Sequence, residues 1–182
     1  MIALDHPWTE DGQRHAFRAI LDAWARPGTI VSLAAWSNGA RARLAVLATL
    51  CDAATSLHDL HGLLDAGDRS RLGAATAAAG NAAFVLAEAA RAPGDFAPRL
   101  GGLLDPELGA TLVLDCQAVG EGPALRLRGP GIDGTSELHV LGVDPGWWRA
   151  RAAWCASPTG VDLVICDGQR VACIPRSTQV EV

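Results

Sequence analysis

The chain has 182 residues, of which 49% are hydrophobic and 19% are charged, and its formal net charge at pH 7 is −5. This composition is typical of a globular protein that can bury its own core, and the negative charge disfavours nucleic acid and anionic lipid as partners. All 15 basic residues are arginine, which excludes a Schiff-base lysine for pyridoxal phosphate and a Walker phosphate-binding loop.

The N-terminal stretch MIALDHPWTEDG carries acidic residues where a signal peptide needs basic residues and then an apolar run. No stretch reaches the roughly 18 apolar residues that a membrane-spanning helix needs. The cysteines are odd in number and none lie at CxxC spacing, so neither a disulfide framework nor a zinc ribbon is indicated. We therefore expect one domain over residues 1–182, in a cytoplasmic protein with reduced thiols.

Residues 9–25 predict a helix with one apolar face. Thr9 can cap the helix, and acidic residues follow it, where they suit the positive end of the helix dipole. Apolar side chains recur at helical spacing and form the expected buried face. These side chains are Phe17, Ile20, Leu21 and Trp24.

The next elements alternate between helix and strand. Residues 29–33 predict a short strand, and residues 40–54 predict a second, apolar helix. In the alanine-rich stretch that follows, we expect a helix over residues 69–79 and, after a Gly-Asn break, a strand at residues 83–86.

From residue 109 onward, short strands bounded by Gly, Pro and Asp dominate. Asp144-Pro145 opens another helix, and the chain finishes with a hairpin that turns at Asp167-Gly168. Helices interleaved with strands, followed by an antiparallel set, predict an α/β fold with a central mixed sheet flanked by helices. The predicted strands are GATLVLDC (109–116), ALRLRGPGI (124–132) and SELHVLGV (136–143).

His58 and His61, with Asp59 and Asp65 nearby, have the composition of a metal site. A helix would bring the two imidazoles together. Two histidines do not make a site, however, and no third ligand is indicated. We expect a partly exposed helix end here and no bound metal.

Cys166 and Cys173 flank the turn of the final hairpin. Neither register of that turn places them directly opposite each other, so a disulfide between them is not expected. Each is interpreted as a small buried hydrophobic residue.

The end of the hairpin, Arg176-Ser177-Thr178, is a candidate contact for a phosphate or carboxylate group, or for a nucleotide. An arginine fork with neighbouring hydroxyls suits such an anion. The alternative is that these residues only form the polar end of the hairpin.

Two other turns are weaker candidates for the same role. Gly129-Pro130-Gly131 follows a strand and could present backbone N–H groups, although Pro130 removes one donor. Arg26 lies in a Pro-Gly turn after the first helix and could also contact an anion. The alternatives are a turn that redirects the strand and a helix stop.

Trp147, Trp148 and Trp154 share the helix that Asp144-Pro145 opens. Adjacent residues on a helix point about 100° apart, so Trp147 and Trp148 require either a wide buried face or a surface that meets a partner. Tryptophan is over-represented at such interfaces. The sequence leaves both readings open.

The order of four stretches along the chain resembles the PhnH family, whose members are subunits of the bacterial carbon–phosphorus lyase system. The stretches are QRHAFRAILDAWARPGTI from Gln13, GATLVL from Gly109, LRLRGPGI from Leu125 and GVDLVICDGQRVACIPRSTQVEV from Gly160. The chain departs from the family pattern at its DHPW start, at residues 155–159 and at Ser177, where the family commonly has threonine.

The resemblance implies a fold similar to the large domain of pyridoxal-phosphate-dependent transferases, but without the cofactor. It implies a homodimer within a core complex of three other subunit types. With ATP and an ATP-binding-cassette-type partner, that complex attaches a phosphonate to ribose and forms ribose 1-phosphonate 5-triphosphate. A separate radical S-adenosylmethionine subunit then cleaves the carbon–phosphorus bond. This chain would be an accessory subunit, not itself catalytic and without a cofactor.

Two alternatives remain at this stage. One is a free-standing nucleotide-dependent transferase, which needs a nucleophile–base pair or a metal cluster that the sequence does not supply. The other is a small-anion-binding protein that holds a phosphonate or a nucleotide.

Overall fold

The computed structural model describes residues 6–37 and 39–182. Residues 1–5, on which the signal-peptide argument and the DHPW departure partly rest, lie outside this range. No helix within it is long and apolar enough to cross a membrane.

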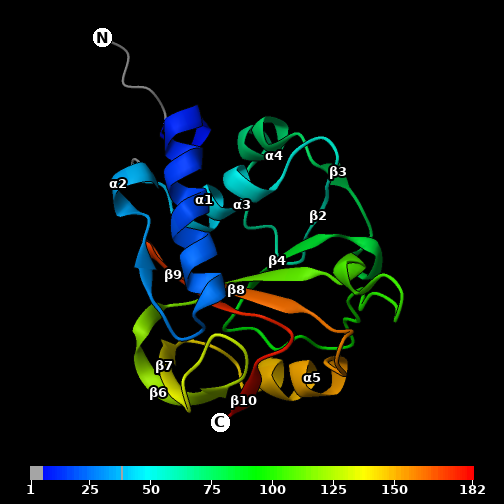
Figure 1. Cartoon of the computed structure of the whole chain (residues 1–182). Coiled ribbons are helices and arrows are strands. Elements are labelled where there is room, and N and C mark those ends of the chain that lie inside the picture. The colour runs from blue at the N-terminus through cyan, green and yellow to red at the C-terminus, as the bar shows by residue number, and fades with distance from the viewer. Residues whose placement is uncertain (1–5, 38) are drawn as a thin grey trace.

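Helices and strands alternate along most of the chain (Figure 1). The helices are η1 (His6–Trp8), α1 (Glu10–Ala25), α2 (Ala34–Ser37), α3 (Ala42–Leu50), α4 (Ala66–Leu72), η2 (Ala79–Asn81), η3 (Pro106–Leu108) and α5 (Gly146–Trp154). The strands are β1 (Val31–Ser32), β2 (Ser56–Asp59), β3 (Ala75–Thr76), β4 (Phe84–Glu88), β5 (Thr111–Asp115), β6 (Ala118–Arg128), β7 (Ser136–Leu141), β8 (Asp162–Cys166), β9 (Arg170–Ile174) and β10 (Gln179–Glu181).

Seven strands of the described residues form a mixed sheet in the order β1-β9-β8-β5-β4-β2-β3. Strands β8, β5, β4, β2 and β3 run parallel, whereas β9 pairs antiparallel with both β8 and β1. A smaller antiparallel sheet has the order β10-β6-β7. In Figure 1, α1 and α3 lie on one side of the large sheet, and α5 lies on the other with the small sheet. The predicted α/β fold with a central mixed sheet and flanking helices is confirmed.

The large sheet has a hydrophobic core on each of its faces, because successive side chains of a strand point to opposite sides. In β8, Leu163 and Ile165 pack into the core shared with α5 and the small sheet. Val164 and Cys166 pack into the core shared with α1 and α3. All four side chains are buried, so this strand reads as a continuous apolar run, as expected for a central strand.

Helix α1 begins and ends close to its predicted bounds, but its buried face differs from the predicted one. The Thr9 hydroxyl accepts a hydrogen bond from the Gly12 N–H at 3.1 Å. The helix buries Ile20 together with small residues, whereas Phe17 is 48% exposed and Leu21 is 55% exposed. The predicted burial of Phe17 and Leu21 is therefore wrong for the single chain, because the small side chains form the face that packs on the sheet.

The helix expected at residues 58–61 is wrong, and the helix predicted over residues 69–79 is confirmed only as far as Leu72. Gly73 adopts a left-handed conformation with a φ of 67°, and α4 ends at the residue before it. His58 lies in strand β2, where its Nδ1 is 2.9 Å from the Ala77 carbonyl oxygen. The Nδ1 of His61 accepts from the Glu88 N–H at 3.0 Å. No group of three or more metal-ligating side chains occurs in the described part of the chain.

The β8–β9 hairpin forms as predicted, and Asp167 holds its turn. This buried carboxylate accepts from the N–H groups of Gln169, Arg170 and Val119 at 2.7–2.9 Å. Burial alone would raise the pKa of Asp167, but these bonds and the Arg170 guanidinium give a net lowering. Because Val119 belongs to β6, this side chain also joins the two sheets.

The cysteines of the hairpin are not paired. Cys166 lies opposite Val171 and Cys173 lies opposite Val164, so their registers differ. All five cysteines of the chain lie within the described residues, and each is a free thiol there. The sequence-based expectation of no disulfide is confirmed.

Candidate functional site

A hollow of about 330 Å³ separates helix α5 from the turn that follows β9, and we call it the arginine hollow. The described residues that line it include two arginines and several hydroxyl groups, but no acidic side chain. The residues that line it are Trp148, Arg151, Ala152, Cys155, Ser157, Arg176, Ser177, Thr178, Gln179 and Val180.

Arg151 comes from α5 and is only 4% exposed. Its Nη2 donates to the carbonyl oxygens of Pro175 at 2.7 Å and Thr178 at 2.9 Å, which fixes the turn against the helix. Burial lowers the pKa of Arg151, since desolvation disfavours the charged form. No ion pair to this side chain occurs within residues 6–37 and 39–182, and its buried Nε has no hydrogen-bond partner there.

Thr178 is 2% exposed and belongs to the same turn. Its N–H donates to the Pro175 carbonyl at 2.9 Å and closes the turn. Its hydroxyl oxygen is buried, with no hydrogen-bond partner among the described residues. Ser177, between Thr178 and Arg176, is exposed on the rim of the arginine hollow.

Arg176 forms an internal ion pair, so its guanidinium donors are not free to bind an anion. Its Nε lies 3.2 and 3.1 Å from the two carboxylate oxygens of Asp162, and its Nη2 also bonds that carboxylate. Its backbone N–H donates to the same carboxylate at 2.7 Å. The remaining nitrogen, Nη1, donates to the carbonyl oxygen of Pro106 in η3. Arg176 therefore ties β8, the final turn and the loop before β5 together, and most of its donors are already used.

The three predicted anion-binding turns lie close together, but backbone packing is what joins them. A Cβ on Gly129 would lie 3.0 Å from the Ser177 carbonyl oxygen, and one on Gly131 would lie 2.2 Å from the Ala25 carbonyl oxygen. Both glycines also have positive φ, so close approach and conformation account for them. Arg26 is exposed and pairs with Asp22 on α1.

The tryptophans of α5 fit the wide buried face better than a partner surface. Trp147 is 1% exposed and donates from its indole N–H to the Arg91 carbonyl at 2.8 Å. Trp148 is 8% exposed. Trp154 is half-buried and packs edge-to-face on Phe96, with ring centroids 5.7 Å apart. Of the three, only Trp154 has substantial surface in the single chain.

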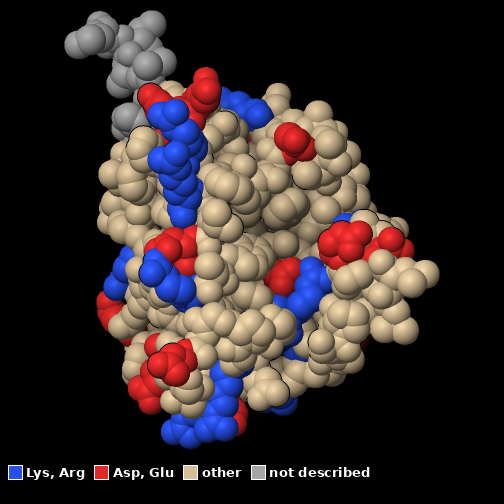
Figure 2. Space-filling view, viewed as in Figure 1, with Lys and Arg blue, Asp and Glu red and all other residues tan. Residues whose placement is uncertain are grey.

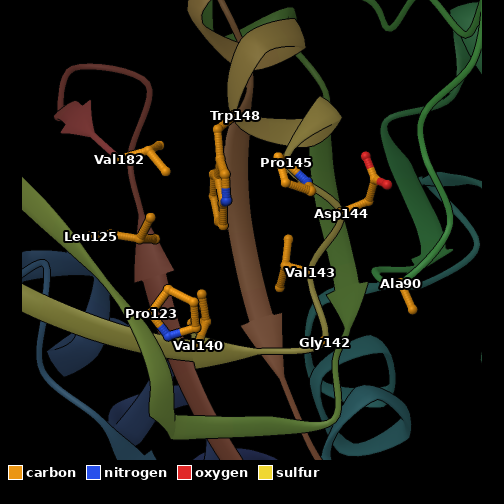
Figure 3. Close-up of a pocket in the computed structure, with 10 residues that line it drawn as sticks. All are labelled: Ala90, Pro123, Leu125, Val140, Gly142, Val143, Asp144, Pro145, Trp148 and Val182. Carbon is orange, nitrogen blue, oxygen red and sulfur yellow. The ribbon is translucent and has the colours of Figure 1, made fainter.

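A second hollow, of about 260 Å³, is shown in Figure 3 and shares Trp148 with the arginine hollow. Its walls are mainly apolar, from Leu125 and Val140 of the small sheet and from Val182. Asp144 is turned away from the indole ring in Figure 3, and its carboxylate accepts from the Gly146 N–H at 2.7 Å at the start of α5. This hollow therefore offers apolar contact and little polar chemistry.

Sequence reasoning missed Arg151. The signal was present, because Arg151 lies four residues after Trp147 and three after Trp148 and therefore shares their side of the helix. An arginine on an apolar helix face indicates either a buried polar contact or a site, and here it lines the arginine hollow.

The cysteine thiols should differ sharply in reactivity. Burial raises the pKa of Cys51 to about 12 and that of Cys116 to about 12, and it also raises those of Cys166 and Cys173. Since the thiolate is the reactive form, we expect iodoacetamide to modify half-buried Cys155 first and the others only after unfolding. Peptide mass spectrometry over a time course would measure this order. Fast labelling of Cys51 or Cys116 in the native chain would contradict it.

Comparison with known proteins gives matches over almost the whole chain. The sequence profile of a family described as "Bacterial phosphonate metabolism protein (PhnH)" matches residues 5–181. A protein of Stutzerimonas stutzeri, named as the C-P lyase subunit protein HtxG, is 45% identical over 177 residues, which cover 96% of this chain and 89% of that protein. The alpha-D-ribose 1-methylphosphonate 5-triphosphate synthase subunit PhnH of Rhizobium meliloti (strain 1021) is 32% identical over 189 residues, which cover 91% of this chain and 88% of that protein.

Proposed function

Because this chain belongs to the PhnH family of bacterial phosphonate metabolism proteins, we propose that it works as a subunit of the carbon–phosphorus lyase core complex. The observation that carries the proposal is the nearly full-length match to two proteins that are both named as subunits. A subunit needs surfaces for its neighbours, and the exposed apolar side chains of this chain supply candidates.

Within that complex, the proposed role is structural or accessory. The chain would support the ATP-dependent formation of ribose 1-phosphonate 5-triphosphate by holding the other subunits in place, and it would act in the cytoplasm. Its relationship to the large domain of pyridoxal-phosphate-dependent transferases stays a prediction. The absence of lysine from the sequence argues that no Schiff-base cofactor is involved.

The loop between β4 and β5 is the proposed contact with another kind of subunit. It projects at the right of Figure 1 and carries Leu103, 78% exposed, and Leu104, 93% exposed. Hydrogen bonds within the loop and from Arg176 hold its backbone, so the leucines are presented with little further ordering. Figure 2 shows acidic side chains near this projection, and Asp105 and Glu107 follow the leucines in sequence. We expect an apolar pocket with a basic rim on the partner.

Helix α1 carries the proposed homodimer surface. Phe17 and Leu21 are about half exposed on it. With Trp24, Leu50 and Phe84 they line a hollow of about 320 Å³ that is almost entirely apolar. A contiguous apolar surface of this kind marks an interaction site more often than an isolated exposed residue does.

Co-expression with the cognate lyase subunits, with an affinity tag on this chain alone, tests the proposal. Native mass spectrometry of the purified material would give its composition. We expect a large complex of fixed stoichiometry. A clean monomer or dimer that captures none of the other subunits would contradict the proposal and favour the free-standing transferase or the small-anion-binding protein.

A further inference from the structure

Arg151 is a buried cation that forms no direct ion pair with any of the described residues. The carboxylate of Asp162 acts on Arg151 from a distance and opposes the lowering of its pKa, but this carboxylate is already paired with Arg176. These three side chains together therefore carry one net positive charge, and Arg151 itself is only 4% exposed. Burying a charge without a partner is costly, and natural proteins usually supply a counter-charge or use the site.

The unused hydrogen-bonding capacity lies in the same place. The Nε of Arg151 and the hydroxyl of Thr178 are both buried without partners among the described residues, and both side chains line the arginine hollow. Buried polar atoms are normally satisfied, so each exception requires an explanation such as an unseen water, ion or ligand. Two such atoms beside one hollow, one of them on a buried cation, point to an anion.

We propose that the arginine hollow binds the phosphoryl or phosphonyl group of a small molecule. The guanidinium of Arg151 would supply the charge, and the hydroxyls of Thr178 and Ser177 would donate to the oxygens. A tetrahedral group has enough oxygens to engage all three. Because the two unpartnered atoms are buried below the surface of the hollow, we expect binding to draw both side chains toward the ligand.

The size of the hollow limits the ligand. About 330 Å³ is at the low end of ordinary ligand pockets. It has room for a phosphoryl or phosphonyl group with a small substituent. Trp148 closes one side of the hollow and would pack against that substituent. The sequence assigned the anion contact to Arg176, whereas this proposal assigns it to Arg151. The N–H groups of Arg176 are already bonded to Asp162 and to the Pro106 carbonyl.

The inference does not depend on membership of the complex, so the purified full-length chain is the material for its test. Isothermal titration with methylphosphonate and with inorganic phosphate, at constant ionic strength, would give the dissociation constants of the wild type and three variants. Thr178→Val removes the hydroxyl with little change of shape. Arg151→Lys keeps the positive charge but removes the planar set of guanidinium N–H donors. Arg149→Gln, at an exposed position of the same helix, is the control for a loss of charge.

We expect the wild type to bind both anions and Thr178→Val to weaken binding about tenfold, as the loss of one hydrogen bond to a charged group predicts. Arg151→Lys should weaken it at least as much, and Arg149→Gln should bind as the wild type does. Thermal melts without ligand provide the folding control, because Thr178→Val removes an unsatisfied hydroxyl and should not lower the melting temperature. No saturable binding by the wild type, or equal binding by all four proteins, would overturn the proposal.

Discussion

Replacement of Arg176 by alanine is expected to lower the free energy of unfolding by about 3–5 kcal/mol, as breaking one side of a buried ion pair typically does. Asp162, which is only 9% exposed, would lose its ion-pair partner. The carbonyl of Pro106 would also lose the donor that fixes η3. Urea unfolding followed by tryptophan fluorescence would measure the change.

Arg126 offers a matched control for that experiment. It pairs with Glu181 at 3.8 Å, and both side chains are more than half exposed. Exposed pairs contribute only about 0–1 kcal/mol, so Arg126→Ala should leave the unfolding midpoint almost unchanged. If Arg176→Ala were as stable as Arg126→Ala, the Asp162 pair would not be a structural link, and Arg176 would again be free to contact a ligand.

The double variant Leu103→Asp, Leu104→Asp is expected to remove the other lyase subunits from the purified complex while leaving the isolated chain folded. Burial of a leucine side chain contributes about 1.5–3 kcal/mol. The loss of two such contacts would therefore weaken the association by about a hundredfold or more. Since both side chains are exposed in the single chain, its own stability should hardly change. Co-purification yield and a thermal melt would measure the two effects separately.

Ile30 provides the control at a different surface, because it is 39% exposed and lies outside both proposed contact regions. Ile30→Asp should co-purify with the other subunits as the wild type does. An intact complex with the double leucine variant would move the proposed contact away from the β4–β5 loop. The subunit role itself would stand in that case, because the wild-type experiment tests it independently.

Local sequence signals located most helices and strands, but they did not show which side chains of these elements are buried. Thr9 and the apolar spacing after it predicted α1 correctly, since capping and periodicity are local properties. The exposure of Phe17 and Leu21 was not predictable, because periodicity does not say which apolar residues the chain itself covers. The alanines of residues 73–79 favour a helix, but Gly73 adopts a left-handed conformation and ends α4 before them.

One part of the candidate site could likewise be predicted from the sequence, and another part could not. The hairpin register that sets Leu163 opposite Ile174 also brings Asp162 near Arg176, so this ion pair could have been inferred once the hairpin was predicted. Arg151 could not be placed in this way. Its carbonyl partners come from a turn 24 and 27 residues further along the chain, and only the packing of α5 against that turn brings them together.

The order of the strands has a consequence for when this protein can fold during its synthesis. Residues 162–181 supply β8 and β9 within the large sheet and β10 at the edge of the small one. Until they leave the ribosome, β1 lacks β9, its only strand neighbour within the described chain, and neither core can close. Pairings as distant as Val31 with Val171 are slow to form. The large sheet should therefore be completed only after residues 162–181 have been synthesised, and the β4–β5 loop, which Arg176 holds through the Pro106 carbonyl, should reach its final form only then.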